Sequence, residues 1–379
     1  MMIQPVKTAI VGCGMISDAY LNTMTNKFKI LEVVGCCDQN PEKAQAMAQK
    51  YGVKVLTMEE ILADDSIEIV VNLTAPTAHY PVIKQLLEAG RHVYTEKVLS
   101  VELEHAAELV RIADQKNLYL GAAPDTFLGS AIQTARYMVD SGMIGDVTSC
   151  YCALTRDSDI LNRAFPFTAK PGGGIGFDVG IYYITALLSI LGPVKEVSGI
   201  VQTRKPERPD YSLEKFGESF QVECENLMTG ILQFECGTIG NVLFDSSSIF
   251  VLPEKPSLVL FGTMGVMYMA DPNRFGGDVR VILKGNNEPF IMQQSHAFSD
   301  ECRGLGVAEM AWAMRRGRKN RANKEMAYHA LNVLHGIVKS SETKSNQIIQ
   351  STFEQTPPIP RGYSGQGSFE FVEEIGIAR

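Results

Sequence analysis

The chain has 379 residues, of which 45% are hydrophobic, and a formal net charge of −8. A chain of this size can bury a large core and is expected to form two domains. Its acidic balance argues against a nucleic-acid partner or an anionic membrane surface, because both require clustered positive potential. The sequence shows neither a signal-peptide pattern nor an apolar run as long as a membrane span, so we expect a cytoplasmic protein.

Strand and helix signals alternate at short intervals in the first third of the chain, which is typical of a parallel sheet covered by helices on both faces. Helices are predicted over residues 41–51 and after a capping box at 57–60, and strands over 67–73 and 92–95. Polar and glycine-containing segments follow these strands, at the edge where open α/β sheets bind ligands. We predict a doubly wound, Rossmann-type domain over residues 1–124.

A glycine turn follows the first apolar run, in the segment 11–17 (Val-Gly-Cys-Gly-Met-Ile-Ser). Gly12 allows a tight turn, and Gly14 allows the backbone to approach a pyrophosphate that faces the free N–H groups of the next helix. Ser17 replaces the usual third glycine, at a position that serves the packing of helix on strand. We expect cofactor contacts from Gly12, Gly14, Met15 and Ile16.

Asp38 ends a strand-like segment, 31–37, about twenty residues beyond the glycine turn. A carboxylate there can accept hydrogen bonds from a ribose 2′-hydroxyl and would repel a 2′-phosphate, so NAD is favoured over NADP as cofactor. The alternative is a turn residue, since Asn40 could cap a helix that begins at Pro41.

The pattern changes after Pro124. A helix is predicted over about 126–141, and period-two alternation then indicates an antiparallel sheet with one covered face. The predicted strands are 147–155, 221–226, 231–235, 240–244, 257–261, 266–269 and 279–283, with helices near 304–316 and 324–341. We therefore expect an α+β domain over residues 125–350. The proline-containing tail, 351–379, is expected to be an extended strap or partly disordered.

Three further features have simple structural interpretations. The basic run 315–321 ends an apolar-periodic segment, where cations suit a helix C-terminus and solvent. The eight cysteines never form C-x-x-C and are interpreted as reduced, buried thiols. The six histidines show no metal-binding pairing, so the sequence does not support a metal site.

Several segments together resemble the Gfo/Idh/MocA family, the group of glucose-fructose oxidoreductase and inositol dehydrogenase: 12–14, 74–79, 89–97, 172–182, 260–265 and the 303–318 helix. The resemblance spans nearly the whole chain. It implies a Rossmann domain followed by a domain with a large open, mainly antiparallel sheet, whose outer face commonly makes oligomer contacts. A homodimer or homotetramer is therefore expected.

The resemblance also implies an active site. The family's Glu-Lys-Pro motif reads Glu96-Lys97-Val98 here, and its Asp-x-x-x-His motif reads Asp178 to Tyr182, two residues that share a helix face at i and i+4. Catalytic roles are expected for Lys97, Asp178 and Tyr182. Further cofactor contacts are expected from Thr74, Ala75, Pro76, His79, Glu96 and Lys97.

In the expected mechanism, a substrate hydroxyl lies between Tyr182 and Lys97 while the cofactor takes the hydride. Tyr182 accepts the hydroxyl proton, Lys97 stabilises the oxyanion and lowers the tyrosine pKa from about 10, and Asp178 orients the substrate or Lys97. Each of these residues also has a structural alternative. Lys97 could be a solvated lysine and Glu96 could neutralise a neighbouring charge. Asp178 and His79 could be helix-start residues, and Tyr182 could be a core aromatic.

Substrate recognition is expected from the polar residues that precede the glycine run, namely Arg156, Asp157, Ser158, Asp159, Asn162, Arg163 and Lys170, unless they form a solvated loop. The resemblance implies an NAD(P)-dependent dehydrogenase or reductase of a sugar, cyclitol or similar polyol, or of another small carbonyl compound. Two alternatives are a redox-neutral glycosidase that retains its NAD and a non-catalytic sensor of dinucleotides.

Overall fold

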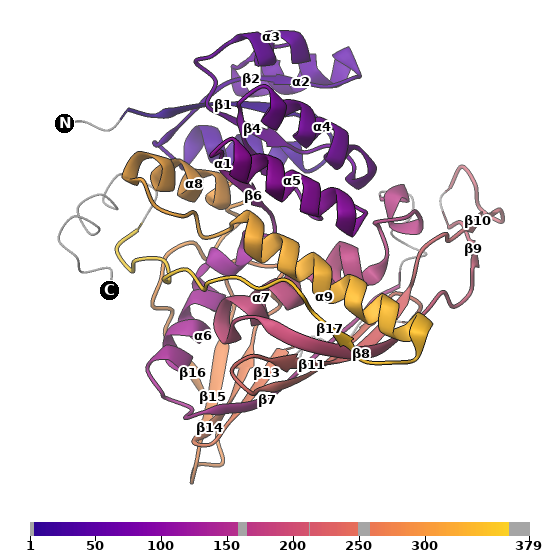
Figure 1. Cartoon of the computed structure of the whole chain (residues 1–379), viewed down its shortest axis with the longest axis vertical. Coiled ribbons are helices and arrows are strands. Elements are labelled where there is room, and N and C mark those ends of the chain that lie inside the picture. Colours follow the sequence, from indigo (N-terminus) through magenta and orange to yellow (C-terminus); the bar gives the residue numbers. More distant parts are fainter. Residues whose placement is uncertain (1–3, 158–164, 212, 249–257, 364–379) are drawn as a thin grey trace.

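The computed structural model describes residues 4–157, 165–211, 213–248 and 258–363. Its first layer is a six-stranded, wholly parallel sheet in the order β3-β2-β1-β4-β5-β6 (Figure 1). The strands are β1 (Val6–Val11), β2 (Leu31–Cys37), β3 (Lys54–Val55), β4 (Ile69–Asn72), β5 (His92–Thr95) and β6 (Leu120–Ala122). The strand order reverses between β1 and β4, so a ligand crevice is expected at the carboxyl ends of these two strands.

Helices on both faces complete this doubly wound domain: α1 (Ser17–Asn26), α2 (Pro41–Tyr51), α3 (Met58–Ala63), α4 (Pro76–Glu88) and α5 (Leu103–Gln115). The predicted helix over 41–51 is confirmed with its cap, because the Asn40 side chain accepts the N–H of Glu42 and Pro41 is the first helical residue. The capping box between Thr57 and Glu60 is also present. Local sequence chemistry therefore sets these helix starts.

The second domain contains a nine-stranded sheet in the order β16-β15-β14-β13-β7-β12-β11-β8-β17. Its strands are β7 (Val147–Thr155), β8 (Val194–Gln202), β11 (Leu227–Phe234), β12 (Ile239–Asp245), β13 (Leu258–Gly262), β14 (Gly265–Met269), β15 (Val279–Leu283), β16 (Phe290–Met292) and β17 (Gln347–Ile348). β7 and β12 pair in parallel, and the other neighbours pair antiparallel. The expected large, mainly antiparallel sheet is confirmed.

Helices cover one face of this sheet and lie between it and the first domain (Figure 1). They are α6 (Ser130–Asp140), α7 (Ile181–Leu191) and α9 (Lys324–Thr343), with α8 (Leu305–Arg316) beside the parallel sheet and a short helix, η1 (Thr126–Leu128), before α6. The uncovered face exposes large apolar side chains, among them those of Tyr151, Ile200, Ile231, Ile239 and Phe261. None of the helices in the described residues is both long and apolar enough to cross a bilayer.

The strand predictions fail at residues 221–226 and at β8. The strand expected over 221–226 is wrong, because β10 (Ser219–Gln221) pairs with β9 (Glu207–Pro209) in a separate ribbon and β11 begins at Leu227. β8 was not predicted, because part of its buried face is glycine rather than apolar. A Cβ on Gly199 would lie 2.7 Å from a methyl of Ile337 on α9, so the helix fills the space that a side chain would occupy.

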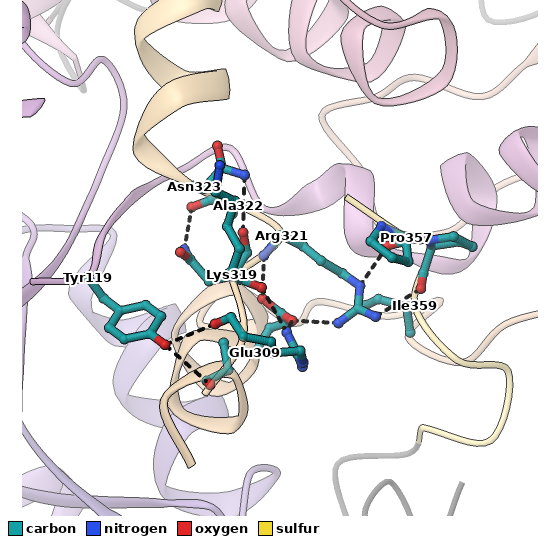
Figure 2. Close-up of polar contacts among 12 residues, drawn as sticks. Tyr119, Glu309, Lys319, Arg321, Ala322, Asn323, Pro357 and Ile359 are labelled. Carbon is teal, nitrogen blue, oxygen red and sulfur yellow. Dashed lines mark hydrogen bonds and ion pairs between the residues drawn. The ribbon is translucent and has the colours of Figure 1, made fainter. Parts of the chain in front are cut away.

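The basic run lies at the C-terminal end of α8 as expected, but its arginines do not simply face solvent. Glu309, buried within α8, accepts hydrogen bonds from the side chains of Arg318 and Arg321 and from the Arg321 N–H. Figure 2 shows how Arg321 also reaches the carbonyl of Pro357, at 2.8 Å. Arg315 pairs with Glu68 of the first domain. These arginines therefore join α8 to its surroundings, and a buried glutamate inside an apolar pattern explains why the run was misinterpreted.

Residues 351–363 form an extended segment without helix or strand that crosses the molecule (Figure 1). Phe353, Ile359 and Tyr363 are buried along it. The Ile359 N–H donates to the Gln133 side chain at 2.8 Å, which ties the segment to α6. The rest of the expected tail, 364–379, lies outside the described residues.

Candidate active site

The glycine turn connects β1 to α1 at the switch point of the parallel sheet. Gly12 has φ +100°, and a Cβ there would lie 2.7 Å from the Leu73 backbone, so only glycine fits without a shift. A Cβ on Gly14 would meet nothing within 4 Å, which leaves room beside the turn. Ser17, at the position of the usual third glycine, is buried and donates to the Gly14 carbonyl at 2.6 Å. Within the described part of the chain no side chain caps the start of α1, and the N–H groups of Ser17 and Ala19 donate to the carbonyls of Gly14 and Ile16. The positive end of the helix dipole still faces the turn, where it favours an anion.

Asp38 is held against this turn. One of its carboxylate oxygens accepts the Cys13 N–H at 2.7 Å, and the other accepts the Asn40 N–H at 2.8 Å. The turn role and the cap at Asn40 are therefore both present. Each oxygen keeps a further acceptor site, so the carboxylate can also meet a ribose hydroxyl.

The segment between β4 and α4 forms the second side of the crevice. Thr74, Ala75 and Pro76 line a cavity of about 420 Å³ together with Gly14, Met15 and Ile16. His79 lies behind this wall, fully buried, with Nδ1 2.6 Å from the Val98 carbonyl oxygen and Nε2 3.0 Å from that of Thr74. Burial lowers its pKa. His79 therefore connects two segments of the cavity wall.

Lys97 follows β5 and points across the cavity to the second domain. Its Nζ donates to the Asp178 carboxylate at 2.6 Å and to the Asp178 carbonyl at 2.8 Å. Asp178 also accepts a hydrogen bond from Arg156, so both carboxylate oxygens face a cation. Burial opposes ionisation of Asp178, but the charges of Lys97 and Arg156 hold its pKa below the usual value. Burial opposes the Lys97 ammonium as well, yet Asp178 keeps the pKa of Lys97 above its usual value.

The backbone around Asp178 differs from the expected regular α-helix. Residues Gly176–Gly180 form a π-helical turn, η3, which continues directly into α7. Such turns are frequent at functional sites. A Cβ on Gly174 would lie 1.9 Å from a carboxylate oxygen of Glu225, so the glycine run lets the chain pack tightly just before η3.

Tyr182, on α7, lines the same cavity and lies beneath Lys97, whose Nζ is 5.7 Å from the centre of its ring. Burial raises the pKa of Tyr182, the charge of Lys97 lowers it, the charge of Glu96 raises it, and the charge of Arg303 lowers it again. The net shift is upward. Lys97 thus acts on Tyr182 as expected, but burial outweighs its effect, so the phenol is neutral near neutral pH.

Glu96 supports this arrangement from behind. It accepts the Tyr20 hydroxyl at 2.8 Å and the Lys97 N–H at 3.1 Å, and it also lines the cavity. The family's proline position holds Val98, and the Lys97–Val98 peptide bond is cis.

Of the residues expected to recognise substrate, Arg156 lines the cavity. Asp157 faces Arg208 at 3.6 Å, and Lys170 pairs with Glu223 on the exposed surface. Ser158, Asp159, Asn162 and Arg163 lie outside the described residues. The structure adds Phe167, Asn273 and Arg303 to the lining. Arg303 begins the 303–318 segment that resembles the family, but no local pattern in the sequence indicates that it lines a cavity with Tyr182.

Comparison with protein families matches both halves of the chain. Residues 6–123 match the model of an oxidoreductase family with an NAD-binding Rossmann fold, and residues 132–268 match the GFO/IDH/MocA C-terminal domain. The chain belongs to the GFO/IDH/MocA family.

Relatives in this family have several named activities. The chain is 28% identical over 212 residues to an uncharacterized oxidoreductase of Schizosaccharomyces pombe and 25% identical over 205 residues to the D-xylose dehydrogenase of Paenarthrobacter nicotinovorans. These matches cover 54% and 52% of this chain and 57% and 52% of the relatives, so the chain spans little more than half their length. A D-glucoside 3-dehydrogenase of Escherichia coli is 28% identical over 63% of this chain and 70% of its own.

Among solved structures, levoglucosan dehydrogenase in complex with NADH and levoglucosan superposes with a TM-score of 0.78. The alignment covers 92% of this chain and all of the neighbour, at 18% identity. At that identity the likeness shows the shared fold.

Proposed function

We propose that this protein is an NAD-dependent oxidoreductase that transfers a hydride between nicotinamide and a secondary alcohol or carbonyl of a sugar, cyclitol or similar small polyol. The observation that carries the proposal is one cavity lined by the glycine turn, by Lys97 and by Tyr182. The names of the xylose and glucoside dehydrogenases support the substrate class.

The residues present fit a dinucleotide. The space beside Gly14 and the uncapped start of α1 suit a pyrophosphate, and Asp38 suits a ribose with a free 2′-hydroxyl. Met15, Ile16, Thr74, Ala75 and Pro76 would form the walls. The bound cofactor supplies the hydride acceptor or donor. Because the negative charge of Asp38 would repel a 2′-phosphate, NAD rather than NADP is the proposed cofactor, and Asp38 is the residue proposed to select it.

The proton is proposed to move at Tyr182. Because its pKa is raised, the neutral phenol donates its proton to the carbonyl oxygen in reduction, and the phenolate accepts the hydroxyl proton in oxidation. Lys97 stabilises negative charge on the same oxygen, since Asp178 keeps its ammonium charged and in place. Arg156, which also contacts Asp178, lines the same cavity and is proposed to contact the substrate.

A test is a screen of absorbance at 340 nm with NAD and, separately, NADP against sugars, cyclitols, sugar acids and diols, and with reduced cofactor against the carbonyl forms. We expect NAD-dependent turnover that Lys97→Ala and Tyr182→Phe abolish while each variant still binds NAD. Both variants keeping full activity would refute the mechanism. Cleavage of a glycoside without net NADH formation would refute a net dehydrogenase.

We also propose that the protein forms a homodimer or homotetramer through the uncovered face of the nine-stranded sheet. Exposed apolar side chains on five adjacent strands support this, because apolar surface of this kind marks protein interfaces. Light scattering is expected to report an oligomer that Ile231→Glu, near the centre of the face, converts to monomer. A monomeric wild-type protein would refute the proposal.

A further inference from the structure

Two cations in the cavity share a single carboxylate. The Lys97 Nζ donates to one oxygen of Asp178 at 2.6 Å, and the Arg156 guanidinium donates to the other oxygen. All three side chains are shielded from water, with exposures of 13% for Lys97, 14% for Arg156 and 8% for Asp178. Within this group one positive charge has no negative partner. A buried charge without a partner is costly, so the group favours an anion in the cavity.

The other charged groups around the cavity do not remove this excess. Arg303 and Glu96 also line the cavity, so its charged side chains are three cations and two carboxylates. Glu301 pairs with Arg303 from outside the lining, but its side chain is 50% exposed, and water weakens ion pairs at such positions. The lining therefore carries one positive charge in excess.

Arg156 is the cation with hydrogen-bond donors to spare. A guanidinium has several N–H donors, and Arg156 directs one of its nitrogens to Asp178. Its Nε is buried and has no hydrogen-bond partner among the residues that the structure describes. The Lys97 ammonium, by contrast, donates to Asp178 twice. Arg303 donates to Asn273 at 3.1 Å. A ligand acceptor that reaches Arg156 would therefore use donors that the protein leaves open.

A carboxylate suits this position better than a phosphate. Guanidinium and carboxylate groups form paired, charge-assisted hydrogen bonds with matching planar geometry. The single excess charge of the lining equals the charge of one carboxylate, whereas a phosphate dianion would bring a second charge without a partner. Because Asp178 holds Arg156 beside Lys97, a carboxylate on Arg156 would lie near the hydroxyl that Lys97 is proposed to bind.

On these contacts, and resting on the proposed function, we infer that the substrate is a sugar acid whose carboxylate binds Arg156 while a nearby hydroxyl lies between Lys97 and Tyr182. Arg156 is then the residue that selects the acid over a neutral sugar of similar shape. In oxidation, the carbon that bears this hydroxyl gives its hydride to the cofactor and the hydroxyl gives its proton to Tyr182, while the carboxylate is unchanged.

The test measures binding to the full chain by calorimetry in saturating NADH, and it needs no turnover. The acidic probes are D-gluconate, D-glucuronate and D-galacturonate. Each is compared with its neutral counterpart, D-glucose or D-galactose, and D-glucuronate also with its uncharged methyl ester. At least one acid is expected to have a Kd about ten- to hundredfold below that of its neutral counterpart, as for a hydrogen bond between charged groups. The methyl ester should bind as weakly as glucose.

Variants of Arg156 then test the residue. Arg156→Met should bring the Kd values of the acid and its neutral counterpart together. Arg156→Gln should do the same while it keeps a donor for Asp178, so it decides the question if Arg156→Met does not fold. Lys170→Gln is the control, because it removes a cation that pairs with Glu223 on the exposed surface, and it should leave the preference for the acid unchanged.

The inference would be overturned if no acid in the panel binds at least about tenfold more tightly than its neutral counterpart. A preference for the acid that survives in the Arg156 variants, or tighter binding of D-glucose 6-phosphate than of every acid, would overturn it as well. Tight binding of an acid together with silence in the 340 nm screen would refute the proposed function and leave this inference standing. Turnover of neutral sugars without any preference for an acid would do the reverse.

Discussion

Replacing Glu309 by Gln tests whether the buried ion cluster on α8 holds the protein together. Glu309 is fully buried, and its carboxylate receives Arg321 through the guanidinium at 2.6 Å and the backbone N–H at 2.7 Å, as well as the Arg318 side chain. Removing one partner of a buried ion pair typically costs about 3–5 kcal/mol. Arg318 is 26% exposed and can regain water, whereas Arg321 is 6% exposed and cannot. We therefore expect a loss near the lower limit, about 3 kcal/mol.

The assay is urea unfolding followed by the fluorescence of Trp312, the single tryptophan of the chain, which is buried one turn beyond Glu309. Its transition should move to lower urea in Glu309→Gln. Glu32→Gln, at an exposed position of β2, is the control and should leave the transition in place. A loss below about 1 kcal/mol, the range of exposed pairs, would refute the argument that this cluster acts as a buried pair.

Three other predictions concern pH and cofactor choice. Burial keeps the pKa of Tyr182 above its usual value, so the fraction of phenolate rises with pH throughout the neutral range. The initial rate of alcohol oxidation should therefore rise roughly tenfold per pH unit between about pH 7 and about pH 9, while the rate of carbonyl reduction stays constant. An oxidation rate that does not change with pH would contradict this. Asp38→Asn keeps an acceptor for the Cys13 N–H but removes the charge. It should lower the ratio of kcat/KM with NAD to kcat/KM with NADP by roughly tenfold. An unchanged ratio would show that Asp38 does not select the cofactor. Burial raises the pKa of Glu225 to about 7, so the folded state retains a proton that the unfolded state loses, and the free energy of unfolding should fall as pH rises from about 4.5 to about 7. Glu225→Gln should reduce that fall by up to about 3 kcal/mol in urea titrations, and parallel curves for the two proteins would show that Glu225 does not contribute.

The first domain was predictable because its signals are local. Asn40 with Pro41, and Thr57 with Glu60, determine helix starts through contacts within three residues. The second domain was predictable where strands alternate, as in β15, whose predicted bounds match the structure. It was not predictable at β8, where Gly199 replaces an apolar side chain because Ile337 of a distant helix fills the space.

The same distinction applies to the site. Lys97, Asp178 and Tyr182 were predicted from the sequence as site residues, and all three line one cavity. The contact of Asp178 with Lys97 agrees with one of the two roles expected for Asp178, whereas its second contact, with Arg156, was not predicted. Arg303 lines the same cavity from the residue before Gly304, whose N–H donates to Asp125, a contact between residues far apart in the chain. Within the run at 315–321, the assignment of Arg321 to solvent failed for a related reason, since its partner Glu309 is buried by tertiary packing.

The charges around the cavity then indicate where a proton can move. Asp178 lies between Lys97 and Arg156, which keeps its own pKa low, and its charge in turn keeps the pKa of Lys97 high, so both groups remain ionised across the neutral range. Burial opposes ionisation of the Tyr182 hydroxyl, whereas the charges of Lys97 and Arg303 favour it. The neutral and ionised forms of Tyr182 are therefore closer in free energy than burial alone would allow. Of Lys97, Asp178 and Tyr182, Tyr182 is therefore the residue suited to exchange a proton with a bound substrate. The ion pairs of Asp178 hold the cations Lys97 and Arg156 in the cavity around it.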